Sequence, residues 1–88
     1  MDDIKQKKEE YIRTNRSNIG MEICRHRLKK GYSQAVLADL MGISRATISK
    51  IENGKFAISV DYLAKFSWHL DFNIKISEKI PKYSGIQS

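Results

Sequence analysis

Apolar residues recur every three or four positions through most of the chain, which is the spacing of helices that bury one face. The first stripe is narrow and predicts a surface helix over residues 2–14, carried by Ile4, Tyr11 and Ile12. A second helix is predicted to begin at Ser17-Asn18 and to end at Gly31, with a stripe formed by Ile19, Ile23, Cys24 and Leu28. The first third of the chain therefore predicts two helices.

Three serines each precede a further helical stretch and are suited to cap it: Ser33, Ser44 and Ser59. Gly42 ends the first of these three helices, whose shared face carries Leu37, Ala38 and Met41. Gly54 ends the second, which points Ile48 and Ile51 inward. The third has apolar residues at i, i+3 and i+7, namely Leu63, Phe66 and Leu70.

The period changes after Leu70. Apolar and polar residues alternate strictly over residues 72–77, which predicts a half-buried strand, and the tail from Glu78 holds the only proline, Pro81. We expect a mainly α fold, a compact domain of about five helices followed by a short C-terminal β-strand. The chain then divides into an N-terminal helical extension (1–16), the main domain (17–71) and a strand with its tail (72–88).

Two very short helices follow one another at Ser33–Gly54, and neither would be stable alone in water. Gly42 can adopt the left-handed conformation that ends a helix sharply, and Ser44 starts the next helix after Ile43 fills the corner. So short a connection forces a steep crossing, as in a helix-turn-helix. The second helix would present a small, polar or basic face that fits the major groove: Arg45, Ala46, Thr47, Ser49 and Lys50.

Charge supports a polyanionic partner. The chain has 16 Lys and Arg against 10 Asp and Glu, a net charge of +6, which suits nucleic acid or an acidic membrane surface. The N-terminus lacks the apolar region of a secretory signal, and no apolar run approaches the ~20 residues that span a bilayer. The single cysteine, Cys24, excludes an intramolecular disulfide, which fits a reducing cytoplasm, and we expect it to fill the core. We expect a cytoplasmic protein, associated with the nucleoid if its partner is nucleic acid.

Enzyme chemistry has little support in the sequence. There is no nucleophile–base pair or phosphate-binding loop motif. The two histidines, His26 and His69, are far apart and have no Cys or carboxylate at ligand spacing around them. We therefore expect no enzymatic activity, no cofactor and no metal.

The short-helix region resembles the lambda-repressor/Cro-type (XRE) helix-turn-helix family. The resemblance covers roughly residues 18–71 and rests on fixed spacings among Arg27, Gly31-Tyr32-Ser33-Gln34, Leu37-Ala38, Gly42-Ile43-Ser44, Ile48-Ser49 and Ile51-Glu52-Asn53-Gly54. It implies a DNA-binding regulator whose second short helix is the recognition helix. The short domain that ends in an alternating strand also resembles antitoxins of the HipB type.

The resemblance implies roles for particular residues. Those nearest the DNA would be Ser44, Arg45, Ala46, Thr47, Ser49 and Lys50 of the recognition helix. Arg45 is the expected base reader, because a guanidinium can bind O6 and N7 of guanine together, and the alternative is a plain phosphate contact. Phosphate contacts are expected from Gln34, Asn53 and Lys55. Arg27 and Glu52 match a family pair that forms a salt bridge under the recognition helix, so Arg27 should serve the fold.

Two functions remain open at this point. The first is a transcriptional regulator, most simply a repressor, that binds specific sequences of double-stranded DNA. The alternative is an antitoxin that neutralises a partner toxin enzyme and represses its own operon. Both predict a homodimer on a palindromic operator. Because an isolated strand leaves backbone groups unpaired, the strand at residues 72–77 should pair with a second copy through Phe72, Ile74 and Ile76.

Overall fold

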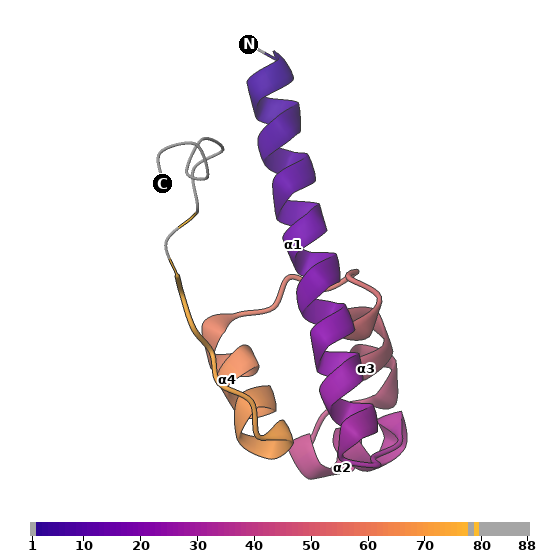
Figure 1. Ribbon diagram of the computed structural model, residues 1–88. Coiled ribbons are helices and arrows are strands. Elements are labelled where there is room, and N and C mark those ends of the chain that lie inside the picture. Colours follow the sequence, from indigo (N-terminus) through magenta and orange to yellow (C-terminus); the bar gives the residue numbers. More distant parts are fainter. Residues whose placement is uncertain (1, 78, 80–88) are drawn as a thin grey trace.

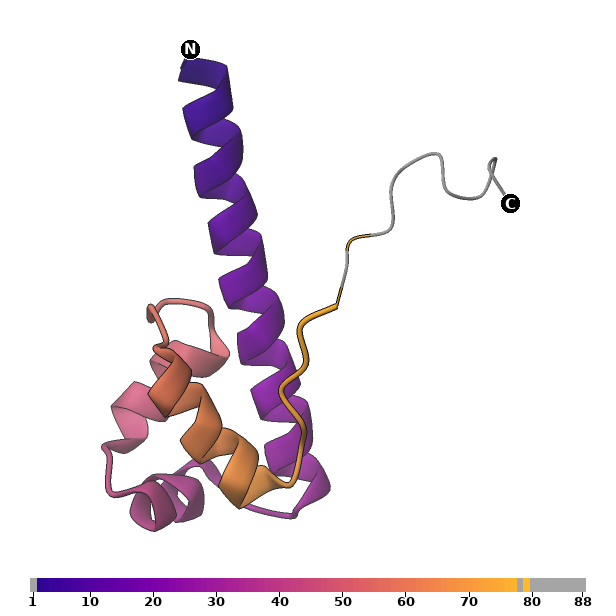
Figure 2. The same ribbon diagram turned by 90° about the vertical axis from the view of Figure 1, so that its left-hand side faces the viewer.

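The computed structural model describes residues 2–77 and residue 79, and this part of the chain contains four α-helices and no strand (Figure 1). The helices are α1 (Asp2–Lys29), α2 (Gln34–Met41), α3 (Arg45–Glu52) and α4 (Val60–Leu70). The C-terminal half of α1 packs against α3 and α4, while its N-terminal half projects beyond the other helices (Figures 1 and 2). The prediction of a mainly α fold is confirmed.

The three predicted serine caps are present. Ser33, Ser44 and Ser59 each have an extended backbone, and each side chain accepts a hydrogen bond from the backbone N–H three residues later. Gly42 ends α2 with φ 68° and ψ 33°, in the left-handed region. These signals are local, because a cap satisfies free N–H groups within one turn of itself, and the sequence alone therefore locates them.

The prediction of two helices before Gly31 is wrong, because α1 runs without a break through Ser17-Asn18. A capping residue starts a helix only where the preceding backbone leaves the helical conformation. Nothing between residues 14 and 18 forces it to do so, since neither proline nor glycine occurs there. The nearby Asn15 instead donates its side-chain amide to the carbonyl of Tyr11 at 2.9 Å, within the helix.

The predicted strand at residues 72–77 is also absent, and this segment forms no helix either. The chain leaves α4 at Asp71, in the left-handed conformation, and runs back along α1 (Figure 2). The Phe72 ring lies 5.1 Å from that of His26, and the Lys79 ammonium lies 4.5 Å from the Tyr11 ring centroid. A strand requires a hydrogen-bonded neighbour, and residues 2–77 and 79 of one chain provide none.

A single core joins the four helices. Its buried members are Ile23, Leu37, Ala38, Ile48, Ile51, Phe66 and Leu70, all of which the sequence pattern points inward. Leu28 is an exception and is 63% exposed. The inner face of α1 follows Ile23 and Arg27, four residues apart, so Leu28 is rotated by about 100° away from it. Cys24 is half-buried beside this face rather than in the core.

Two glycines bring α1 close to the end of α3. A Cβ atom on buried Gly20 would collide with the carbonyl oxygen of Ile51 and lie 2.8 Å from that of Glu52. A Cβ atom on Gly54, whose φ is +71°, would lie 2.9 Å from the Cα atom of Ser17. The absence of side chains at both positions therefore lets α1 contact the backbone at the end of α3 directly.

Candidate nucleic-acid interface

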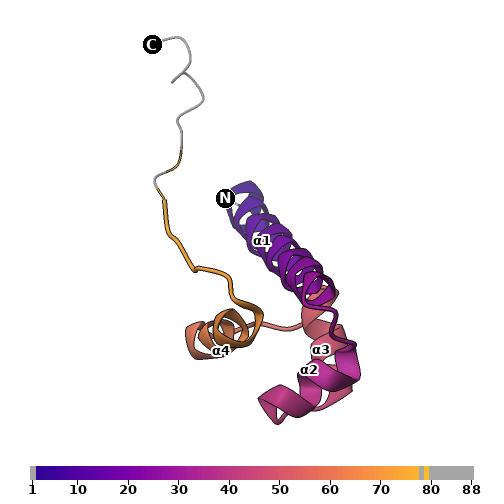
Figure 3. The same cartoon turned by 60° about the horizontal axis from the view of Figure 1, so that its bottom comes forward.

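A tight corner holds α2 and α3 together. The N–H of Gly42 donates to the carbonyl of Asp39 at 3.2 Å, and that of Ile43 donates to the carbonyl of Ala38 at 3.0 Å. Ile43 packs against the core, and Ser44 opens α3 directly afterwards. Figure 3 turns this end of the molecule forward, with α2 and α3 together on one side and α4 on the other. The corner fixes the direction in which α3 points.

The helix α3 has two chemically distinct faces. Ile48 and Ile51 are buried at 0% and 2% exposure and anchor it to the core. Arg45, Ala46 and Lys50 are exposed on the outside. The outward face is therefore small and basic and is held rigidly by the buried face.

The hydroxyl groups at the start of α3 are already engaged with one another. Ser44 Oγ lies 2.8 Å from Thr47 Oγ1 and accepts a hydrogen bond from the Thr47 N–H at 3.1 Å. Asn53 donates its side-chain amide to the Ser49 carbonyl at 2.9 Å, which ties the end of α3 to its own middle. These bonds order the polar side chains that border the outward face.

A depression of about 320 Å³ separates the start of α2 from the outward face of α3 and is lined by Gln34, Arg45, Ala46 and Ser49. Gln34 is the first residue of α2, and Arg45 is the first residue of α3. The positive ends of both helix dipoles therefore lie beside this depression, and neither helix has an acidic residue in its first turn. The depression favours an anion such as a phosphate.

Beneath this surface Arg27 and Glu52 form an ion pair. Arg27 Nε donates to Glu52 Oε2 at 2.6 Å and Nη2 donates to Oε1 at 3.0 Å, with side-chain exposures of 9% and 6%. The remaining Arg27 Nη1 donates to the Tyr32 carbonyl at 2.8 Å. The pair thus links the end of α1 to the end of α3 and to the turn before α2.

Gln34 belongs to the same network, which sequence reasoning did not anticipate. Its Nε2 donates to Glu52 Oε1 at 3.0 Å. The Gln34 amide is thereby held in one orientation, with one N–H and its carbonyl oxygen available for other partners. The sequence shows only that Gln34 begins the first short helix and that Glu52 ends the second, and these positions do not specify a contact.

The ion pair gives Glu52 a pH-dependent role. Burial, the largest single effect, raises the pKa of Glu52, but hydrogen bonds from Arg27 and Gln34 together outweigh it and leave the pKa below the usual glutamate value. Because the lowered pKa means that the charged form stabilises the fold, this stability is present above about pH 4.3 and is lost as the pH falls through the folded-state pKa.

We therefore expect the urea midpoint of the protein to fall between about pH 5 and about pH 3 more steeply than that of Glu52→Gln, which lacks the titrating group. Glu52→Gln should be the less stable of the two at neutral pH. Identical pH profiles for the wild type and Glu52→Gln would show that Glu52 does not stabilise the fold as an anion.

Four further basic residues divide into two pairs. Arg25 forms an ion pair with Glu22 at 2.7 Å, and Lys30 forms one with Asp71. Lys50 and Lys55 are exposed on α3 and just after it, and the backbone N–H of Lys55 donates to the Lys50 carbonyl at 2.8 Å. The second pair thus lies beside the outward face of α3.

Within residues 2–77 and 79, no three His, Cys, Asp or Glu side chains gather in an arrangement that could hold a metal ion. No helix in those residues combines the length and apolar character needed to cross a membrane.

Comparison with known proteins agrees with this geometry. The helix-turn-helix family model matches residues 25–74, more than half of the chain, which includes all of α2, α3 and α4. No curated protein and no solved structure matches the chain. The matched segment contains the α2–α3 corner, the outward face of α3 and the ion pair beneath it. The chain therefore belongs to the lambda-repressor/Cro-type (XRE) helix-turn-helix family of DNA-binding transcription regulators.

Proposed function

We propose that the protein is a sequence-specific repressor that binds a palindromic operator as a homodimer. The observation that carries this proposal is the outward face of α3, which is exposed, basic and fixed by buried isoleucines beside the positive end of α2. A helix held in this way suits the major groove, where side chains meet base edges.

Each residue around the depression then has a role. Arg45 reads guanine through two parallel hydrogen bonds, and Ala46 allows close approach to the bases. Gln34 donates its remaining amide N–H to a phosphate and is oriented for this by Glu52. Other phosphates are met by Asn53 and Lys55, and base or sugar edges by Ser44, Thr47, Ser49 and Lys50.

Arg45→Ala and Lys55→Ala should affect binding differently. Loss of a base reader should cost about 1–3 kcal/mol and relax the preference at one base pair per half-site. Loss of a phosphate contact should weaken all duplexes alike and reduce the slope of log K against log salt by about one. Fluorescence anisotropy on matched and mismatched operators, at several salt concentrations, distinguishes the two. If Arg45→Ala retained the parental base preference, Arg45 would be assigned to a phosphate instead.

The dimer is proposed to close through residues 72–77. Ile74 and Ile76 are 45% and 96% exposed, and the segment's backbone has no strand partner in the described part of one chain. Antiparallel pairing with a second copy would satisfy these groups and cover both isoleucines, together with Phe72 at the edge against His26. A dimer can occupy two half-sites about 34 Å apart on one face of the duplex, which a single helix-turn-helix cannot.

Ile74→Asp should yield monomers with weak operator binding, since it introduces a charge into the shared apolar face. Asn73→Asp is the matched control. It adds the same charge at the neighbouring position, whose side chain would point to the opposite face of the strand, and it should leave the dimer intact. Sedimentation velocity at micromolar concentration measures both variants. A wild-type protein that sediments as a monomer would refute dimerisation through this segment.

The alternative function, an antitoxin, is favoured by one observation. Apolar side chains are exposed on the projecting half of α1, remote from α3, where a protein partner could bind: Ile4, Tyr11 and Ile12. Co-expression with the product of the adjacent gene tests this function. A stable complex that abolishes an enzymatic activity of that product would establish it.

A further inference from the structure

The N-terminal half of α1, residues 3–16, projects as an arm from the domain (Figures 1 and 2). Residues 3–15 are all exposed, and the family match begins only at residue 25. Isolated helices of this length are marginal in water, so a helix that exposes apolar residues gains stability when another surface covers them. Ile4 is 74% exposed, Tyr11 54% and Ile12 48%. The arm thus has an apolar stripe that the described part of its own chain covers little.

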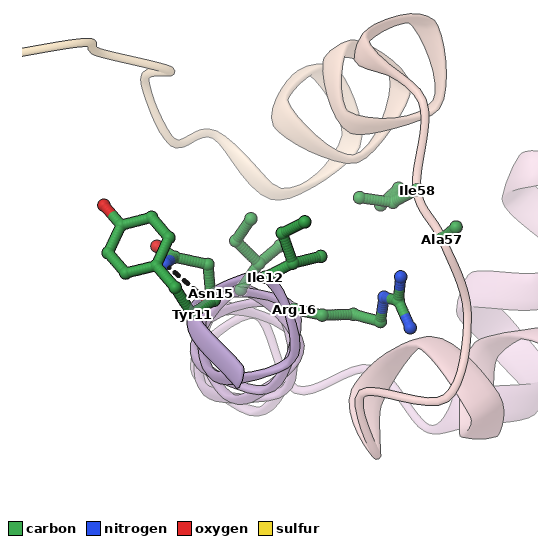
Figure 4. Close-up of a pocket in the computed structure, with 7 residues that line it drawn as sticks. Tyr11, Ile12, Asn15, Arg16, Ala57 and Ile58 are labelled. Carbon is green, nitrogen blue, oxygen red and sulfur yellow. Dashed lines mark hydrogen bonds between the residues drawn. The ribbon is translucent and has the colours of Figure 1, made fainter. Parts of the chain in front are cut away.

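A groove of about 350 Å³ lies between the arm and the loop that joins α3 to α4. Figure 4 shows Ile12 and Arg16 on the α1 side, toward Ala57 and Ile58, with the Tyr11 ring farther from that loop. Asn15 and Ile19 complete the lining. A small molecule would stay largely in water here, because Tyr11 and Ile12 are half-exposed whereas ligand sites enclose most of their ligand. The groove suits an elongated segment of protein that continues along the apolar stripe.

Charges on the arm select the chemistry of that segment. Successive residues are about 100° apart around a helix, which places Lys5, Lys7 and Lys8 within about 85° of the centre of the stripe and Arg16 about 100° from it. The acidic residues Asp3, Glu9 and Glu10 lie farther round. Lys79 adds a fifth cation against Tyr11. Within the described residues, no carboxylate pairs with Arg16, although its side chain lines the groove.

These cations of the arm are not assigned to the operator DNA. Tyr11 precedes the end of α1 by 18 residues, about 27 Å along the helix, and α2 with its depression follows that end. The N-terminal part of the arm therefore lies away from the depression assigned to DNA, whereas the other wall of the groove, Ala57 and Ile58, follows Lys55 by only two and three residues. We propose that the arm groove binds an amphipathic helix of a second protein, whose apolar face is bordered by Asp and Glu. Apolar residues of that helix would enter beside Ile12 and Ile58, and its carboxylates would pair with Arg16 and the lysines.

The test uses the full-length ¹⁵N-labelled protein and two synthetic helices of about 16 residues. Both helices carry leucines on one face, and their flanking positions are all Glu in one and all Lys in the other. We expect the Glu helix to shift the amide signals of Tyr11, Ile12 and Ile58, and to bind at least about tenfold more tightly than the Lys helix. Arg16→Glu should reduce that preference by about threefold or more, with an unchanged circular dichroism spectrum.

Three outcomes would overturn the proposal. Equal binding of the Glu and Lys helices would mean that charge does not select the partner. The absence of any shift at about 1 mM Glu helix would mean that the groove binds no such segment. Shifts of the arm signals caused instead by anionic phospholipid vesicles or by duplex DNA would assign the arm to a lipid surface or to nucleic acid. The first two of these results do not depend on whether α3 binds an operator.

Discussion

Gly20→Ala is expected to lower the free energy of unfolding by about 3 kcal/mol, although alanine is the better helix former. The new methyl group would meet the carbonyl oxygens of Ile51 and Glu52, which are backbone atoms of α3 and cannot rotate aside. Either α1 moves away from α3 or the end of α3 unwinds. For a domain of this size the change corresponds to a drop in Tm of more than about 10 °C.

Asn18→Ala is the matched control for Gly20→Ala. It lies on the same helix two residues away and is exposed, so the gain in helix propensity should appear there unopposed. Thermal unfolding followed by circular dichroism at 222 nm compares the two variants with the wild type. If Gly20→Ala were as stable as Asn18→Ala, α1 would not approach α3 as closely as the structure has it.

Arg27→Ala is expected to destabilise the protein by about 3–5 kcal/mol, because it leaves the Glu52 carboxylate buried without its main partner. The Tyr32 carbonyl would lose a donor at the same time. The double variant Arg27→Met/Glu52→Met removes both charges and should recover a substantial part of the loss. Urea unfolding of Arg27→Met, Glu52→Met and the double variant gives the coupling energy.

The neighbouring Arg25→Ala is the control for the buried pair. Arg25 pairs with Glu22 at the surface, where both side chains are more than half exposed, and its loss should change stability little. An unchanged Tm for Arg27→Ala would remove its structural role and leave a DNA phosphate as its partner.

The sequence was sufficient to locate the motif, because its signals are local. Three serine caps, the left-handed Gly42 and the inward isoleucines of α3 each act within a turn or two of themselves, and all are present in the structure. Leu28 shows the limit of such patterns. It follows the helical spacing of its neighbours but misses the face that tertiary packing selects.

Contacts between distant segments could not be predicted in the same way. Nothing near Gly20 in the sequence indicates that the backbone of α3 passes there, and nothing near Gln34 indicates its bond to Glu52. The continuity of α1 was missed because Ser17-Asn18 has the composition of a cap without the change of backbone direction. The alternation over residues 72–77 predicts a strand correctly only if a second chain supplies the neighbour, which is a property of an assembly.

The central claim is that α3 reads a specific DNA sequence, and selection from a random duplex library with the full-length protein tests it most directly. The expected result is enrichment of one palindromic motif, with half-site centres about one helical turn apart, and loss of that enrichment when Arg45 is replaced by alanine. A library that emerges with its starting composition, at salt concentrations where the protein still retains duplex DNA, would contradict the assignment of α3 as a recognition helix.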